Sequence, residues 1–117
     1  MKILAIDYGR SKIGLATAEG SLAAPWKVIK PGELKKILEK ENFNKIVVGV
    51  SSGAMAEEQR EFARSIGAET FDETLTTKEA QRLSLEAGIG RKKRKGMEDA
   101  FAAALMLQNY LDSIGWN

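Results

Sequence analysis

Two residue types that carry much of enzyme chemistry are missing from this sequence, which contains no cysteine and no histidine. Without cysteine the chain can form neither disulfide bonds nor thiolate metal sites. Without histidine it can have no Ser-His-Asp triad, no imidazole-bound zinc and no imidazole acid or base. Any catalysis must therefore come from carboxylates, lysines, hydroxyl groups or a hard metal ion held by oxygen atoms.

Long apolar runs are missing as well. No stretch approaches the roughly 18 apolar residues that a membrane helix needs, and the first apolar segment reaches Asp7 too early for a secretory signal. The 117 residues are 44% hydrophobic and 29% charged, a balance typical of one globular domain. We therefore expect a cytoplasmic protein with a single domain over residues 1–117 and no membrane association.

The net charge of +2 is too small to identify a partner, but the positive charge is concentrated in one place. Residues 91–95, Arg-Lys-Lys-Arg-Lys, form an uninterrupted basic run between two glycines. Such a run is typical either of a solvated loop or of a surface that contacts phosphate groups.

The pattern of apolar residues predicts an α/β fold. Strands are expected at residues 2–7, 13–18, 26–29, 45–50 and 69–72, and helices at residues 31–41, 54–65, 76–87 and 97–113. Gly9 is expected to supply backbone freedom in the connection after the first strand. The continuous apolar segment 45–50 suits a central parallel strand that is covered on both faces. An antiparallel meander that leads into βαβ units predicts a mixed five-stranded sheet flanked by helices on both sides.

Carboxylates stand at the ends of elements where an α/β fold places its ligands. Asp7 ends the first predicted strand, Asp72 and Glu73 close the last one, and Asp99 lies in the first turn of the last predicted helix. If the first and last strands are parallel neighbours, Asp7 and the Asp72–Glu73 pair meet at the edge where ligands bind. Small side chains after Asp99 would let its helix approach the sheet closely, so that Asp99 faces the same edge.

Each of these acids alone also has a structural explanation. An aspartate after a strand is typical of a turn, and the helix dipole favours a negative charge in the first helical turn. Three carboxylates that converge without histidine or cysteine make a site for a hard cation such as Mg²⁺ or Mn²⁺. Such ions can activate water and stabilise the leaving oxygen of a phosphodiester, which indicates a metal-dependent nuclease.

Four segments, in this order, resemble the YqgF (RuvX-like) family, described as Holliday junction resolvases and as nucleases that process the 5′ end of pre-16S ribosomal RNA. The segments are DYGRSKIGLA (residues 7–16), VVG (residues 47–49), DETLTT (residues 72–77) and DAFAAALMLQ (residues 99–108). The resemblance implies a ribonuclease H-like fold. It also implies that Asp7, Glu73 and Asp99 are metal-binding catalytic acids, with Asp72 ranked behind Glu73.

The sequence departs from the family pattern near the expected site. Lys12 stands where relatives usually carry arginine, and it can still contact a phosphate as a point charge. Thr74 replaces another customary arginine, which removes a positive charge beside the acids. In the basic run we expect Lys93, Arg94 and Lys95 to contact backbone phosphates, which would position a substrate without reading its sequence.

These observations predict a hydrolase that cuts structured nucleic acid with Mg²⁺ or Mn²⁺, with 5′-end processing of pre-16S rRNA on ribosomal precursors as the favoured activity. The alternative within the family is resolution of four-way DNA junctions, for which a two-fold homodimer is expected; the sequence is compatible with a monomer or a homodimer. A third hypothesis is a non-catalytic nucleic-acid-binding or ribosome-assembly module. The Asp-x-Gly hairpin also resembles the phosphate-binding turn of sugar kinases and actin-like ATPases, but those proteins enclose nucleotide between two such domains.

Overall fold

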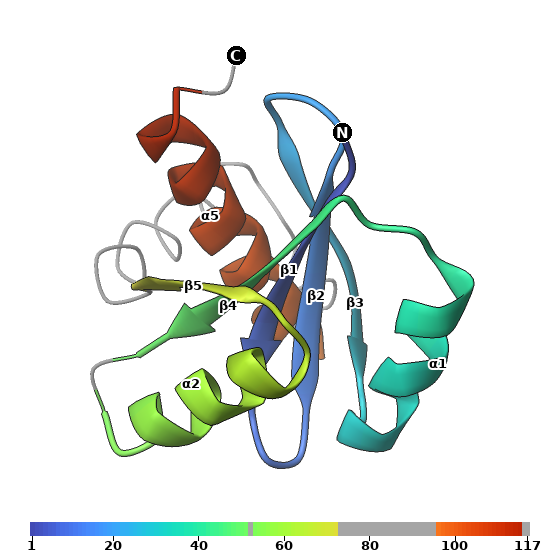
Figure 1. Cartoon of the computed structure of the whole chain (residues 1–117), viewed down its shortest axis with the longest axis vertical. Coiled ribbons are helices and arrows are strands. Elements are labelled where there is room, and N and C mark those ends of the chain that lie inside the picture. The colour runs from blue at the N-terminus through green and yellow to red at the C-terminus, as the bar shows by residue number, and fades with distance from the viewer. Residues whose placement is uncertain (52, 73–95, 116–117) are drawn as a thin grey trace.

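The computed structural model describes residues 1–51, 53–72 and 96–115, which form a five-stranded sheet with helices on both faces (Figure 1). The strands are β1 (Ile3–Tyr8), β2 (Ile13–Ala18), β3 (Ala23–Ile29), β4 (Lys45–Val50) and β5 (Glu69–Asp72). The helices are the short 3₁₀ helix η1 (Pro31–Glu33) and the α-helices α1 (Leu34–Lys40), α2 (Ala56–Ser65) and α5 (Glu98–Ser113). The helix predicted at residues 76–87 lies outside the described residues.

The sheet is mixed, as the sequence predicts, and its strand order is β3-β2-β1-β4-β5. The first three strands are antiparallel to one another, and β1, β4 and β5 run parallel. The expectation that β1 and β5 could be direct neighbours was wrong, because β4 lies between them. Val47 and Val48 of β4 are fully buried, and a strand that is apolar on both faces is stable only where helices cover both sides.

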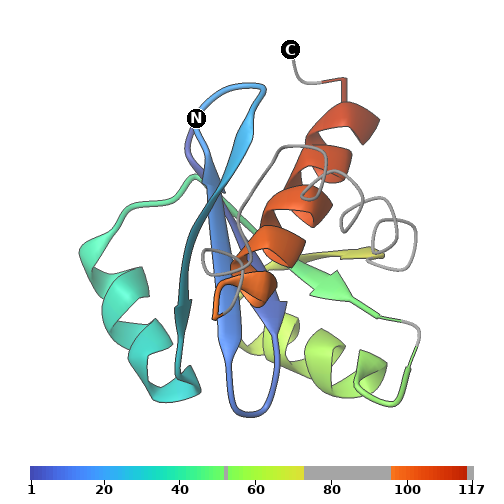
Figure 2. The ribbon, with the colours of Figure 1, turned by 180° about the vertical axis from the view of Figure 1, so that it is seen from behind.

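Alternation along the strands divides the core into two clusters, one on each face of the sheet. Helix α5 covers the face that carries Ile3 and Ala5, and it crosses in front of the sheet in Figure 2. Helices α1 and α2 cover the face that carries Leu4 and Ile6. The α5 residues in the first cluster are Ala103, Ala104, Met106, Leu107, Tyr110 and Leu111.

Strand β3 is longer than predicted. It begins at Ala23 instead of Trp26, and its register with β2 shifts between Leu15 and Ala16, so that Trp26 is an extra residue in β3. Pro25, which cannot donate a backbone hydrogen bond, is tolerated because β3 is an edge strand. The bulge and the proline interrupt the alternating pattern, which is why the sequence indicates only the second half of this strand.

None of the helices in the part of the chain that the structure describes is long and apolar enough to span a membrane.

Candidate functional site

Asp7 lies at the carboxyl end of β1, one residue before the strand ends. Strand alternation puts it on the same face as Ile3 and Ala5, which pack against α5. Its side chain is half-buried, and in the antiparallel register its partner is Gly14 of β2. Asp7 therefore presents a carboxylate on the α5 face of the sheet.

Because Gly14 has no side chain, the backbone at the start of α5 lies directly against β2 beside Asp7. A Cβ placed on Gly14 would overlap the backbone carbonyl of Asp99 and lie 2.7 Å from the backbone nitrogen of Ala100, so only glycine permits this approach. The Cα atoms of Gly14 and Asp7 are register partners, which places them about 5 Å apart. The backbones of Asp7 and Asp99 are therefore both direct neighbours of Gly14.

The first turn of α5 contains two acids in different surroundings. Glu98 is exposed, and its carboxylate accepts a hydrogen bond from the backbone nitrogen of Gly96 (3.1 Å). Asp99 is half-buried and is followed by Ala100, which is fully buried. The positive end of the helix dipole favours a carboxylate at this position. Of the two acids, Asp99 is the one next to the sheet.

Asp72 ends β5 and is exposed. Thr70 lines a groove with residues of α2, whereas Phe71 packs in the cluster under α5. Alternation therefore puts Asp72 with Thr70 on the α2 face, the face opposite Asp7. Asp72 and Asp7 are therefore on opposite faces of the sheet.

Four of the predicted site residues lie outside the described residues, namely Glu73, Lys93, Arg94 and Lys95. Within residues 1–51, 53–72 and 96–115, no group of three acidic side chains forms a metal site. Lys12 is exposed in the connection between β1 and β2. The structure thus brings the backbones of two predicted acids together and leaves their catalytic role a prediction.

The connection between β1 and β2 is tight for a steric reason. A Cβ on Gly9 would lie 2.8 Å from the carbonyl oxygen of Lys12. Gly9 does not have a positive φ, so the expectation that it supplies backbone freedom was wrong, and glycine is needed here for space.

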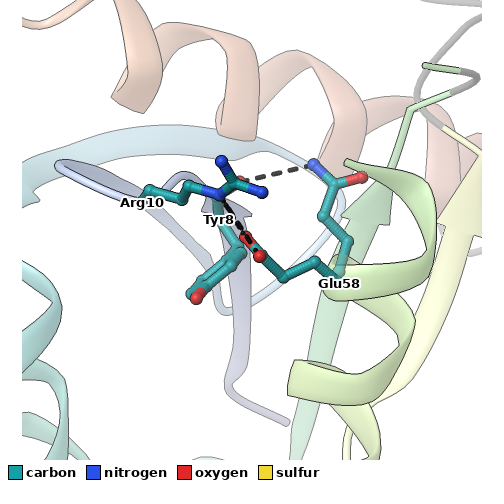
Figure 3. A network of polar contacts seen from close by, with 4 residues as sticks. Tyr8, Arg10 and Glu58 are labelled. Atoms are coloured by element: carbon teal, nitrogen blue, oxygen red, sulfur yellow. Dashed lines mark hydrogen bonds and ion pairs between the residues drawn. The ribbon is translucent and has the colours of Figure 1, made fainter. Parts of the chain in front are cut away.

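Two polar contacts of this region were not predicted. The Nε of Arg10 donates hydrogen bonds to both carboxylate oxygens of Glu58 in α2, at 3.2 and 3.1 Å (Figure 3). The hydrogen bond that Arg10 donates to Glu58, together with the negative charge of Glu58, raises the pKa of the Arg10 guanidinium. The buried Gln59 bonds the ends of β1 and β4. No signal in the sequence pairs residues that are 48 or 51 positions apart.

Comparison with known proteins places the chain among nucleases. Residues 1–113 match the family model described as "RuvX: Holliday junction resolvase". A protein of Endomicrobium trichonymphae named "Putative pre-16S rRNA nuclease" is 38% identical over 95% of both chains. A protein of Moorella thermoacetica with the same name is 36% identical over all of this chain and 99% of its own.

The fold has a counterpart among solved structures. The structure titled "T. thermophilus RuvC in complex with Holliday junction substrate" superposes with a TM-score of 0.56 at 15% sequence identity, covering 100% of this chain and 98% of that chain. The ribonuclease H-like fold that the sequence predicts is thereby confirmed. Because the family model matches almost the whole length, this chain belongs to the RuvX family.

Proposed function

We propose that this chain is a metal-dependent nuclease that hydrolyses phosphodiester bonds in structured nucleic acid, with Asp7, Glu73 and Asp99 as its catalytic acids. The observation that carries the proposal is the close approach of α5 to Gly14, which sets Asp7 and Asp99 on one side of the sheet. Family membership supports the same conclusion, since the family description and the relatives' names both denote enzymes that act on nucleic acid.

The donor set fits Mg²⁺ or Mn²⁺. Asp7 and Asp99 offer carboxylate oxygens, which both ions prefer as ligands, and the sequence holds no histidine or cysteine for a softer metal. When bound, such an ion supplies positive charge to the phosphate and lowers the pKa of a water molecule. Asp7 and Asp99 are the residues that would hold such an ion.

We assign Glu73 to the same set from its place in the sequence. Glu69 and Phe71, the odd-numbered residues of β5, both contact Tyr110 of α5. Glu73 follows these residues in the segment DETLTT, and it is the acid of that segment to which the resemblance assigns metal binding. Cations would hold the substrate beside these acids: Lys12, which is exposed after β1, and Lys93, Arg94 and Lys95 in the basic run.

The favoured substrate is the 5′ region of pre-16S rRNA. Relatives that are 34 to 38% identical over nearly the whole chain carry that name. The alternative, a four-way DNA junction, is supported by the description of the family model. We propose the RNA as the substrate because individual relatives at 34 to 38% identity are named for it, whereas the junction is named by the family model and by a structure that shares 15% identity.

The test is cleavage of a labelled pre-16S RNA 5′ fragment in Mg²⁺ or Mn²⁺, with a four-way DNA junction assayed in parallel. Asp7→Asn and Asp99→Asn should lower cleavage on the order of 100-fold or more, because each removes a proposed metal ligand. Asp72→Asn and Glu98→Gln are matched controls, since each neutralises a neighbouring acid outside the proposed set, and both should retain activity within about twofold. Cleavage by Asp7→Asn at the wild-type rate would refute the assignment.

A further inference from the structure

Helix α2 holds the last residue of β1 and the connection that follows it. Glu58 accepts the hydrogen bonds of Arg10 (Figure 3). Gln59, the next residue, donates its side-chain N–H to the carbonyl oxygen of Tyr8 at 3.3 Å. The ring of Tyr8 stacks on that of Phe62, one helical turn further on, with 4.3 Å between the ring centroids. This end of β1 is therefore attached to α2 by three kinds of contact.

Gln59 also binds the end of β4. Its Oε1 accepts hydrogen bonds from the backbone nitrogen of Ser51 (2.8 Å) and from the hydroxyl group of Ser51 (3.1 Å). Among the described residues Gln59 is the one buried polar side chain, with 4% of its surface exposed. A buried carboxamide is costly unless its polar atoms are bonded. With bonds at both its oxygen and its nitrogen, this side chain has one defined orientation.

The hydrogen bonds of Gln59 to Tyr8 and Ser51 lie where the pairing of the two central strands, β1 and β4, stops. The parallel register of β1 and β4 runs from Ile3 opposite Lys45 to Ile6 opposite Val48. Tyr8 and Ser51 lie beyond that last pair, so Gln59 links the two strands past the end of their pairing. The carboxyl ends of parallel strands are where open α/β sheets bind ligands.

We propose that Gln59 is a positioning residue of the nuclease site, which fixes the end of β1 that carries Asp7 relative to β4 and α2. This inference rests on the proposed function, because it takes Asp7 as a catalytic acid. The hydrogen bond to Tyr8 holds the backbone one residue after Asp7, so loss of the bond lets the carboxylate move. Misplacement of a reacting group by 1 Å can lower a rate about 100-fold.

The chain offers a matched control in Gln108 of α5. Its Oε1 accepts a hydrogen bond from the backbone nitrogen of Ala23 (3.0 Å), and its Nε2 donates to the carbonyl oxygen of Ser21 (2.9 Å) and to the carboxylate of Asp112 (3.2 Å). Gln108 thus bridges two backbone groups as Gln59 does, but at the connection between β2 and β3. Gln59→Met and Gln108→Met both remove such a bridge without a change of charge.

The experiment compares the folding midpoint, the kcat and KM for RNA cleavage, and the Mn²⁺ affinity measured by calorimetry for both variants and the wild type. Both substitutions should lower the folding midpoint, since each leaves backbone groups without their partner. Only Gln59→Met should lower kcat, by about 10-fold or more, and weaken Mn²⁺ binding, with the KM for RNA unchanged within about twofold. Equal losses in the two variants, or an unchanged kcat in Gln59→Met, would overturn the inference.

Two further variants keep the result interpretable. Gln59→Glu retains the acceptor for Ser51 and loses the donor to Tyr8, so it decides the question if Gln59→Met does not fold. Asp7→Asn is measured in the same assays. If Asp7→Asn binds Mn²⁺ and cleaves RNA like the wild type, the proposed function is refuted. The positioning role of Gln59 is then refuted as well, because it depends on Asp7 being a catalytic acid. If Asp7→Asn is impaired while the Gln59 and Gln108 variants behave alike, only the role of Gln59 is refuted.

Discussion

At the scale of single residues, Gly14 is the position where packing and the proposed chemistry meet. We expect Gly14→Ala to lower the free energy of unfolding by about 1–3 kcal/mol, because the added methyl group would overlap the backbone of Asp99 and force α5 away. Cleavage should fall as well, since the same shift separates Asp99 from Asp7. Gly20→Ala is the control, because a Cβ there meets nothing within 4 Å.

Urea unfolding and the RNA cleavage assay together check this expectation. The control should unfold within about 0.5 kcal/mol of the wild type and cleave at its rate. If Gly14→Ala has the same unfolding midpoint and activity as Gly20→Ala, the close approach of α5 at Gly14 is not required for the fold or the site.

Some residues of the site could be predicted from the sequence and others could not. Asp7 and Asp99 stand out because an acid at the end of an apolar strand and an acid in a first helical turn are local features. The role of Gly14 depends on which helix crosses β2, and the pairing of Gln59 with Tyr8 depends on where α2 lies. These are properties of tertiary packing, which residue spacing does not encode.

At the scale of elements, the same distinction separates strand boundaries from strand neighbours. The bounds of β2, β4 and β5 agree with the prediction, because each is set by local apolar pattern and by flanking polar residues. The order of the strands depends on which faces are covered. The apolar character of β4 on both faces predicts its central place, and that place is what separates β1 from β5.

A polar cluster joins α5 to the starts of β4 and β5. The hydroxyl group of Tyr110 donates a hydrogen bond to Glu69 (2.8 Å) and accepts one from the Nζ of Lys45 (3.0 Å), which also lies 3.3 Å from the Glu69 carboxylate. The hydrogen bond from Tyr110 lowers the pKa of Glu69, burial opposes this, and the hydrogen bond and charge of Lys45 lower it further. The cluster therefore stabilises the fold through an ionised Glu69.

The pH dependence of this cluster follows from the direction of the shift. The pKa of Glu69 is lower in the folded chain than its ordinary value of about 4.5 in the unfolded chain. Its stabilisation is complete above the unfolded-state pKa and is lost as the pH falls through the folded-state value. Tyr110→Phe should cost about 1 kcal/mol or less at pH 7, because the carboxylate is half-exposed.

The difference between Tyr110→Phe and the wild type should shrink in acid. Urea unfolding at pH 7 and at pH 3 measures it directly. A difference that stays constant between the two pH values would show that Tyr110 stabilises the fold by packing alone.

At the scale of the whole molecule, binding of a polyanion should depend on where positive charge lies and on salt. Lys12 is exposed next to the proposed site, whereas Lys40 is exposed at the end of α1, which covers the other face of the sheet. Each phosphate contact releases about one counterion. Lys12→Ala should therefore reduce the slope of log K against log salt concentration by about 1, and Lys40→Ala should leave it unchanged.

RNA binding measured by fluorescence anisotropy at several salt concentrations gives both slopes. Equal slopes for the two variants would show that Lys12 does not contact the phosphates of the RNA.

The choice between RNA processing and junction resolution is also a property of the whole molecule. Symmetric cutting of a four-way junction needs two sites related by a two-fold axis, and a stable dimer buries roughly 1,200–2,000 Å². Cleavage of a single RNA strand needs one site, so the proposed RNA substrate predicts a cleavage rate per chain that does not change with protein concentration. Analytical ultracentrifugation beside parallel RNA and junction cleavage tests this: a stable dimer that makes paired cuts in the junction faster than it cuts the RNA would establish the resolvase instead.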